Sequence, residues 1–453
     1  MRYTTAGLLL LSALPSAAPG QSPATLPESV RANLLARIAS GSWPGVVIGL
    51  IDRSGARYYA FGKSALPDGA PVGASTVFEI GSISKVFTSL ALADMVVRGE
   101  AKLDDPIQGY LPAGIQAPER SGKPITLRLL AAQRSGLPRM PGNFEPRDST
   151  NPYADYDSTR MYAFLSGYTL PRDPGAQYEY SNLGVGLLGT LLARKDGGTW
   201  ETMVQRRVLR PLGMRATMVK LTPEARANLA PGHSAGRPVP NWELDALAGA
   251  GALRSTAEDM TRFLAAAMGL RPTPLDSAFR LTEAPQFDAG SPTMQIGMGW
   301  HILGRPTMEI VWHNGGTGGY RSFAGFDRTR QLGVVVLANS TVSVDDIGFH
   351  LLDSTRALVA PRVAIALPED SLEAYVGRYQ LAPTFRIAIT RQRDTLYAQA
   401  TGQDRFPLFA SARNEFFLRD VDAQVSFERD GQDRVVALIL HQGGGNPRAP
   451  RMP

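Results

Sequence analysis

Residues 78–87 read Phe-Glu-Ile-Gly-Ser-Ile-Ser-Lys-Val-Phe, which places a serine and a lysine three positions apart. The apolar pattern predicts a helix from about Ser82 to Val97. On it Ser82 and Lys85 share one face, near an N-terminus whose free N–H groups favour developing negative charge. A buried lysine favours its neutral amine and can take a serine proton. The structural alternative is equally simple: Ser82 caps the helix, and Lys85 is a solvated helix residue.

A second cluster, the Tyr-Ser-Asn of residues 180–182, follows the Pro174–Gly175 turn and precedes an apolar helix predicted near 183–195. A phenol beside a lysine can pass protons, and an asparagine amide can orient a lysine or a substrate carbonyl. The structural alternative makes Asn182 the helix cap and places Tyr180 in the core.

A third cluster spans residues 312–320, Trp-His-Asn-Gly-Gly-Thr-Gly-Gly-Tyr, and runs toward a strand predicted at 333–338. Small residues on an edge strand let a substrate backbone approach and pair with it. His313 is able to donate to a substrate carboxylate or to shuttle a proton. The structural alternative is a tight glycine turn beside a histidine with satisfied hydrogen bonds.

These clusters, in this order, resemble the serine β-lactamase and penicillin-binding protein superfamily. The group most similar holds class C β-lactamases, secreted D-alanyl-D-alanine carboxypeptidases, D-aminopeptidases and related esterases. The resemblance covers about residues 28–355. It is carried by segments 78–87, 103–107, 110–112, 125–130, 135–138, 174–175, 180–182, 211–214, 251–253, 255–256 and 313–319.

The resemblance implies roles for named residues. Ser82 is similar to the acyl-forming nucleophile of that superfamily, Lys85 to its proton partner and Tyr180 to its general acid and base. Further positions correspond to the substrate-binding residues, Asn182, His313, Asn314 and Gly315, and to the oxyanion-hole N–H groups, those of Ser82 and Gly316.

The expected activity is therefore hydrolysis through an acyl-enzyme on Ser82. Its expected substrates are amides or esters, such as D-amino-acid peptides cleaved in a carboxypeptidase- or aminopeptidase-like manner, or small esters. Residues 313–315 stand where the resemblance places Lys-Thr-Gly in many β-lactamases, and a histidine is only partly charged at neutral pH. A class C-like β-lactamase is thus the first alternative, and a non-catalytic penicillin- or muropeptide-binding receptor is the second.

The composition excludes several other classes. The net charge is +6 (47 − 41), and no basic run is denser than residues 391–393, so no nucleic-acid partner is expected. Cysteine is absent, which excludes disulfides and thiolate catalysis. The five histidines are scattered and lack metal-site spacing, so we expect neither metal nor cofactor. The expected partner is a peptide or small-molecule substrate, and the oligomeric state stays open.

The first twenty residues are typical of a secretory signal peptide. Arg2 precedes an apolar run that starts at Ala6, and small residues follow at 16–18. We expect cleavage after Gly20, a periplasmic or secreted protein, and no stable membrane span once residues 1–20 are removed. The alternative for this segment is a buried first helix.

The domain order follows from where the patterns change. Strands at 45–51, 58–61 and 334–338 with helices between them predict an α+β fold whose sheet joins first to last. The resemblance implies an antiparallel sheet flanked by helices, with an all-helical subdomain, over residues 21–360. A linker is expected at 361–370, and alternating strands predict a small C-terminal antiparallel β-sheet or barrel domain over 371–453.

Overall fold

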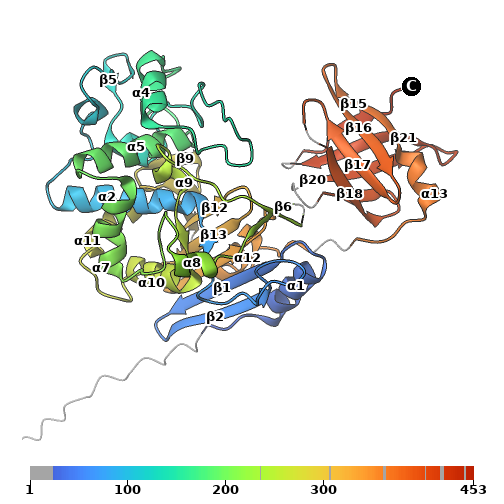
Figure 1. Cartoon of the computed structure of the whole chain (residues 1–453), viewed down its shortest axis with the longest axis horizontal. Helices are drawn as coiled ribbons and strands as arrows, with labels where there is room; N and C mark the ends of the chain where they lie inside the picture. The colour runs from blue at the N-terminus through green and yellow to red at the C-terminus, as the bar shows by residue number, and fades with distance from the viewer. Residues whose placement is uncertain are drawn as a thin grey trace, which may run out of the picture.

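The computed structural model describes residues 24–234, 236–305, 308–360, 364–403, 405–418, 423–442 and 445–453. The predicted signal peptide, residues 1–20, lies outside the described residues. Figure 1 shows a part built from a sheet and helices, which ends with α12 (Asp345–Leu352), and a mainly β part that follows it in the chain.

An eight-stranded antiparallel sheet joins the start of the chain to a much later segment. Its strand order is β2-β1-β14-β13-β12-β11-β10-β9, and Ile48 of β1 lies opposite Val336 of β14. The α+β prediction, with a sheet that joins first to last, is confirmed. The strands are β1 (Gly45–Asp52), β2 (Gly55–Gly62), β9 (Phe287–Ser291), β10 (Met294–Ile296), β11 (His301–Arg305), β12 (Met308–Gly316), β13 (Arg321–Asp327) and β14 (Leu332–Ala338).

Both faces of this sheet are covered, which explains the unbroken apolar runs in its central strands. On one face Val46 belongs to a buried cluster with α1 (Glu28–Ala39) and α12. On the other face Val47 belongs to the larger cluster that includes α10 (Ala257–Ala267) and most of the helical region.

The helical region is organised around α2, whose side chains from Ser84 to Met95 are all buried. This helix packs against α5, α9 and α11. The region contains α2 (Ser84–Val97), α3 (Leu127–Ala131), α4 (Ser158–Gly167), α5 (Asn182–Lys195), α6 (Trp200–Val204), α7 (Arg210–Leu212), α8 (Pro223–Ala227), α9 (Ala248–Gly251) and α11 (Asp276–Glu283). Short strands pair as β3 (Phe78–Glu79) with β8 (Arg254–Ser255), β4 (Glu119–Arg120) with β5 (Lys123–Pro124), and β6 (Gly232–Ser234) with β7 (Arg237–Val239).

Two helix starts differ slightly from what the sequence suggests: Asn182 was the alternative cap for α5, and the Ser-Thr-Ala-Glu of residues 255–258 is typical of a capping box that opens α10 at Ser255. Ser181, rather than Asn182, caps α5, because its Oγ accepts the N–H of Gly184 at 2.8 Å. Thr256, rather than Ser255, caps α10, because Ser255 is already paired in β8. In both cases the hydroxyl one position away satisfies the free N–H groups at the helix start.

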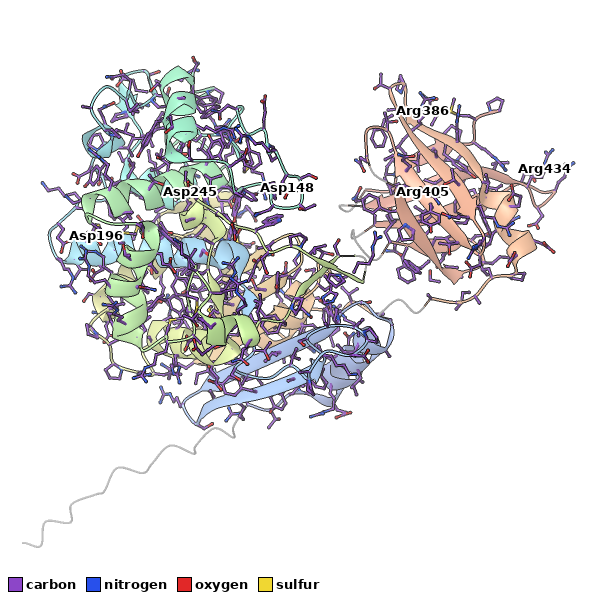
Figure 2. The ribbon with its side chains drawn as sticks, in the orientation of Figure 1. Asp148, Asp196, Asp245, Arg386, Arg405 and Arg434 are labelled. Carbon is purple, nitrogen blue, oxygen red and sulfur yellow. The ribbon has the colours of Figure 1, made fainter. Side chains whose placement is uncertain are left out.

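The long segment at 138–156, rich in Pro, Asn and Asp, contains no helix or strand. It is nevertheless anchored, because Asn143 Oδ1 accepts the hydroxyl of Tyr156 at 2.9 Å and the Asn143 carbonyl accepts Arg160 at 2.8 Å. Figure 2 shows Asp148 of this loop at the surface. Taken over the described ranges, no helix has both the length and the apolar character needed to cross a bilayer.

The C-terminal strands form a second eight-stranded antiparallel sheet that nearly closes into a barrel. They follow chain order, and first and last strands meet at a bridge between Tyr379 and Arg451. Aromatic rings in tilted and edge-to-face contact fill the interior, with Phe427 4.8 Å from Tyr375 and 5.6 Å from Tyr379 between ring centres. The barrel form of the prediction is thus observed. The elements are α13 (Glu369–Leu372), β15 (Gly377–Ala382), β16 (Phe385–Gln392), β17 (Thr395–Ala400), β18 (Arg405–Ala412), β19 (Glu415–Phe417), β20 (Ala423–Arg429), β21 (Val435–Gln442) and β22 (Arg448–Pro450).

Candidate active site

Ser82 and Lys85 meet where a short 3-10 turn, Gly81–Ile83, leads into α2; the helix begins two residues later than predicted. Lys85 Nζ lies 2.9 Å from Ser82 Oγ and donates to the carbonyl of Ala250 at 2.7 Å. The lysine is fully buried, and burial, followed by the charge of Arg139, holds its pKa well below the usual value. An amine in this state is readily neutral and can take the serine proton.

Two glycines allow the serine turn to approach β12. Gly81 has a φ of +50°, and a Cβ built there would lie 2.7 Å from the nitrogen of Gly316. A Cβ on Gly315 would lie 2.0 Å from the carbonyl oxygen of Ile80. No side chain fits at either place. The backbone of Gly316 therefore lies against the turn that carries the serine, as the predicted oxyanion hole requires.

Tyr180 lies over the same pair. Its side chain shares a hydrogen bond with Ser82, and Lys85 Nζ is 4.9 Å from the centre of its ring. Burial raises the pKa of Tyr180 above its usual value, and the bond to Ser82 offsets this only partly. The phenol therefore keeps its proton at neutral pH and is suited to donate it.

The Tyr-Ser-Asn segment is held by the stretch that follows α3. The N–H of Ser181 donates to Gln133 Oε1 at 2.7 Å, and its Oγ donates to the Pro138 carbonyl at 2.6 Å. The N–H of Asn182 donates to the carbonyl of Arg139 at 3.0 Å. The phenol is thus positioned by backbone contacts, which leave its hydroxyl free for the serine.

His313 lies beside Tyr180, with 6.2 Å between ring centres. Its Nδ1 is 2.5 Å from the Asn314 carbonyl oxygen, which only accepts, so Nδ1 carries the proton. Burial, followed by the charges of His301 and Lys85, holds the pKa of His313 well below the usual value. The ring is therefore neutral with Nε2 as an acceptor, a state that does not fit the expected donation to a carboxylate.

Two further residues near His313, Tyr178 and His301, were not predicted from the sequence as site residues. The Tyr178 hydroxyl lies 3.0 Å from His301 Nε2, and the His301 ring centre is 5.1 Å from that of His313. Burial lowers the pKa of His301 to about 4, so this ring is neutral too. The pairing of β11 with β12 could have identified His301, because it places His301 opposite Trp312, the residue next to His313.

A family model described as Beta-lactamase matches residues 30–353, a range that contains every residue of this site. The chain belongs to the Beta-lactamase family. The superfamily recognised from the three sequence clusters is thereby confirmed, and with it the class of serine hydrolase. A second model, described as a domain of unknown function (DUF3471), matches residues 361–448.

Comparisons with single proteins agree with this family assignment. The chain is 28% identical over 375 residues to the protein named Beta-lactamase from Escherichia coli (strain K12), covering 75% of this chain and 95% of that protein. It is 28% identical over 309 residues to D-alanyl-D-alanine-carboxypeptidase/endopeptidase AmpH from the same strain, covering 65% and 78%. A solved class C β-lactamase aligns with a TM-score of 0.63 and 22% identity over 73% of this chain and 97% of that one, which shows the fold.

Within this β-lactamase-family site, the two asparagines expected to bind substrate contact different parts of the protein. Asn182 Nδ2 is 3.6 Å from Met140 Sδ, a contact with the loop wall. Asn314 Nδ2 donates to Asp345 Oδ2 at 2.6 Å, at the start of α12. Because strand side chains alternate, Asn314 lies on the face opposite His313. The structure thus does not bring the Asn314 amide to the serine.

The structure therefore gathers Ser82, Lys85, Tyr180 and His313, with the Gly315–Gly316 backbone beside them. Over the described residues, no cluster of three or more His, Cys, Asp or Glu is placed to hold a metal ion.

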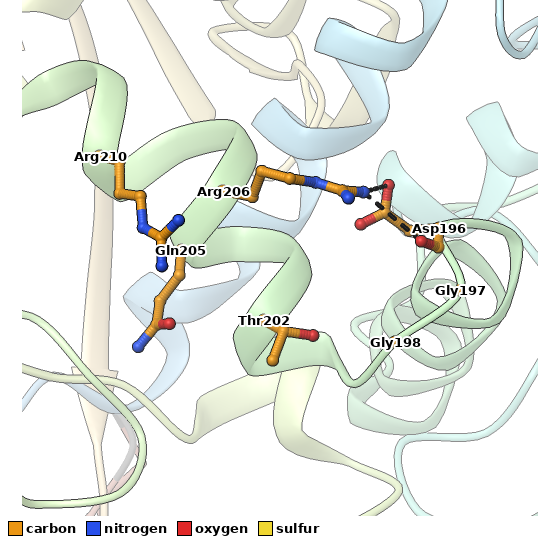
Figure 3. Close-up of a pocket in the computed structure, with 7 residues that line it drawn as sticks. All are labelled: Asp196, Gly197, Gly198, Thr202, Gln205, Arg206 and Arg210. Atoms are coloured by element: carbon orange, nitrogen blue, oxygen red, sulfur yellow. Dashed lines mark hydrogen bonds and ion pairs between the residues drawn. The ribbon is translucent and has the colours of Figure 1, made fainter.

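A surface hollow elsewhere contains none of these residues (Figure 3). It lies at the far end of α5 from the Tyr-Ser-Asn segment, about 20 Å away at 1.5 Å per helical residue. Its Arg206 is already paired with Asp196. The lining residues are Asp196, Gly197, Gly198, Thr202, Gln205, Arg206 and Arg210.

Proposed function

We propose that this β-lactamase-family chain is an exported hydrolase that forms an acyl-enzyme on Ser82 and cleaves D-amino-acid peptides or small esters. One observation carries the proposal: Lys85 Nζ lies 2.9 Å from Ser82 Oγ in a buried setting that favours the neutral amine. The relative named as a D-alanyl-D-alanine-carboxypeptidase supports the D-peptide substrate class.

Acylation needs one proton acceptor and one proton donor. Ser82 Oγ attacks the substrate carbonyl carbon while its proton passes to Lys85 Nζ. The N–H groups of Ser82 and Gly316 stabilise the negative oxygen of the tetrahedral intermediate, as a pair of fixed donors does. The carbon–nitrogen or carbon–oxygen bond then breaks, and the leaving atom takes the proton of the Tyr180 hydroxyl. The proton on Lys85 restores the phenol.

Deacylation reverses these roles. A water molecule attacks the ester carbonyl of the acyl-enzyme, and its proton passes to the neutral amine of Lys85. The carbon–oxygen bond to Ser82 breaks, and Ser82 Oγ takes that proton. The released product is a carboxylic acid, and Lys85 and Tyr180 return to their starting states.

The substrate class is tested by a panel of D-alanyl peptides, D-aminoacyl amides, p-nitrophenyl esters and nitrocefin. We expect kcat/KM for the best peptide or ester to exceed that for nitrocefin by at least about 100-fold, because neutral His313 offers no cation on β12 for the ring-fixed carboxylate of a β-lactam. The L-alanyl counterpart of each peptide is the control. Nitrocefin as the best substrate would contradict the proposal and establish a β-lactamase.

Export follows from the N-terminal pattern of residues 1–20, with Arg2 before an apolar run. We propose that the mature protein begins after Gly20 and resides in the periplasm or outside the cell. N-terminal sequencing of the fractionated protein tests this; a mature chain that retains Met1 in the cytoplasm would contradict it.

A further inference from the structure

Arg139 is an exposed cation beside the reacting groups. Its Cζ lies 5.1 Å from the centre of the Tyr180 ring. Its charge also acts on the site electrostatically, since it lowers the pKa of Lys85 and opposes the rise in the pKa of Tyr178. In the part of the chain that the structure describes, no hydrogen bond or ion pair engages its guanidinium.

The backbone of this residue is fixed while its side chain is free. The Arg139 carbonyl accepts the N–H of Asn182 at 3.0 Å and of Leu183 at 3.2 Å, where α5 begins. The preceding Pro138 carbonyl accepts the Ser181 hydroxyl at 2.6 Å. The backbone of Arg139 is therefore held beside the Tyr-Ser-Asn segment, and the guanidinium, 5.1 Å from the centre of the Tyr180 ring, retains its hydrogen-bonding capacity for a ligand.

The other basic side chains near the site either have a lowered pKa or already donate hydrogen bonds to backbone carbonyls. Burial lowers the pKa of Lys85, His301 and His313 and so disfavours their charged forms. Arg321, beside Gly316, donates to the carbonyls of Thr317 and Tyr320 at 3.2 and 3.0 Å.

Arg134 is engaged as well, because it donates to the carbonyls of Gly175 and Asp288 at 3.0 and 2.7 Å. Among these described groups, Arg139 alone is a permanent charge whose guanidinium makes no hydrogen bond or ion pair.

We infer that Arg139 binds a carboxylate on the substrate's leaving group, so that the enzyme selects scissile bonds followed by a free C-terminal carboxylate. This rests on the proposed function, in which Tyr180 protonates the leaving atom. Because Arg139 Cζ is 5.1 Å from the centre of the Tyr180 ring, a carboxylate two bonds from the atom that this phenol protonates comes within reach of the guanidinium. The planar fork of arginine matches a carboxylate with two parallel hydrogen bonds.

The test compares two ester substrates that differ only in charge, N-acetyl-D-alanyl-D-lactate and its terminal carboxamide. Wild type is expected to prefer the carboxylate. Arg139→Gln is expected to lose about 10- to 100-fold more kcat/KM on the carboxylate than on the carboxamide, the range for a hydrogen bond to a charged group. Arg139→Lys keeps the positive charge but not the planar guanidinium that makes two parallel hydrogen bonds. This variant should retain part of the preference for the carboxylate substrate.

The control is Arg147→Gln, which removes the same charge from an exposed side chain of the same loop. It should leave the preference at the wild-type value. Rates are compared at the pH optimum of each variant, because loss of Arg139 also raises the pKa of Lys85. An equal loss on both esters, or a wild type without preference, would overturn the inference while leaving the acyl-enzyme intact. Hydrolysis of neither ester, with Ser82 unlabelled by a fluorophosphonate, would overturn the proposed function and the inference with it.

Discussion

Lys85→Met is expected to lower kcat/KM by about 1,000- to 10,000-fold on every substrate, in the upper range for loss of a general base. Methionine has a similar length and suits a fully buried site, but it cannot accept the proton of Ser82. Single-turnover acylation with a p-nitrophenyl ester measures the effect, because release of p-nitrophenolate reports the first step directly.

The pH dependence of the wild type provides a second readout of the same residue. Lys85 has a lowered pKa and acts in its neutral form, so kcat/KM should fall as pH drops through that lowered value and should be fully present above it. His313→Gln should keep this acid limb, because His313 is already neutral.

Lys195→Met, at the far end of α5, is the charge-matched control and should behave as wild type. Acylation by Lys85→Met within 10-fold of wild type would remove the lysine from its proposed role.

Tyr180→Phe is expected to separate substrates by their leaving groups. Amide hydrolysis should fall about 100- to 10,000-fold, the range for loss of a general acid, because an amine must be protonated before it departs. p-Nitrophenyl ester hydrolysis should fall far less, because p-nitrophenolate leaves without a proton. The pair of kcat/KM values in wild type and variant measures this separation.

The neighbouring phenol supplies the control for this variant. Tyr178 is bonded to His301 at 3.0 Å rather than to the serine, so Tyr178→Phe should lower both rates to a similar, small extent. If Tyr180→Phe slowed the amide and the ester equally, Tyr180 would be a positioning residue and not the proton donor.

Much of the site was readable from sequence because its chemistry depends on residue type and short spacing. Ser82 and Lys85 lie three positions apart on one continuous turn, so their contact follows from helical geometry. The burial of Lys85 could not be read in the same way, because the groups that exclude water from it come from distant segments such as the Ala250 carbonyl.

The protonation state of His313 could not be predicted from the sequence, for a similar reason. Its tautomer is set by the Asn314 carbonyl, and its low pKa by burial together with His301 and Lys85. The placement of Asn314 on the opposite face follows from strand alternation. That inference needed a strand assignment for residues 308–316, whereas the glycines there equally suggested a turn.

In the fold, the long apolar elements were predicted and the short or interrupted strands were missed. Strand β18 contains Pro407, which weakens a strand pattern, and β22 has only three residues. Strands β9 and β10 are short and partly exposed, so they lack the apolar alternation that marks a buried face. These strands are defined by pairing with the adjacent strands, β9 with β10 and β10 with β11 for example, rather than by a buried face.

The most direct measurement is the covalent attachment site of a fluorescent penicillin or fluorophosphonate, mapped by peptide mass spectrometry. The expected result is a label on the peptide that contains Ser82, absent from Ser82→Ala. Ser89→Ala is the matched control, because Ser89 is a buried serine of α2, the helix that follows Ser82, and its hydroxyl makes no hydrogen bond in the described structure; this variant should label as wild type does. Equal labelling of Ser82→Ala and wild type would contradict the acyl-enzyme on Ser82.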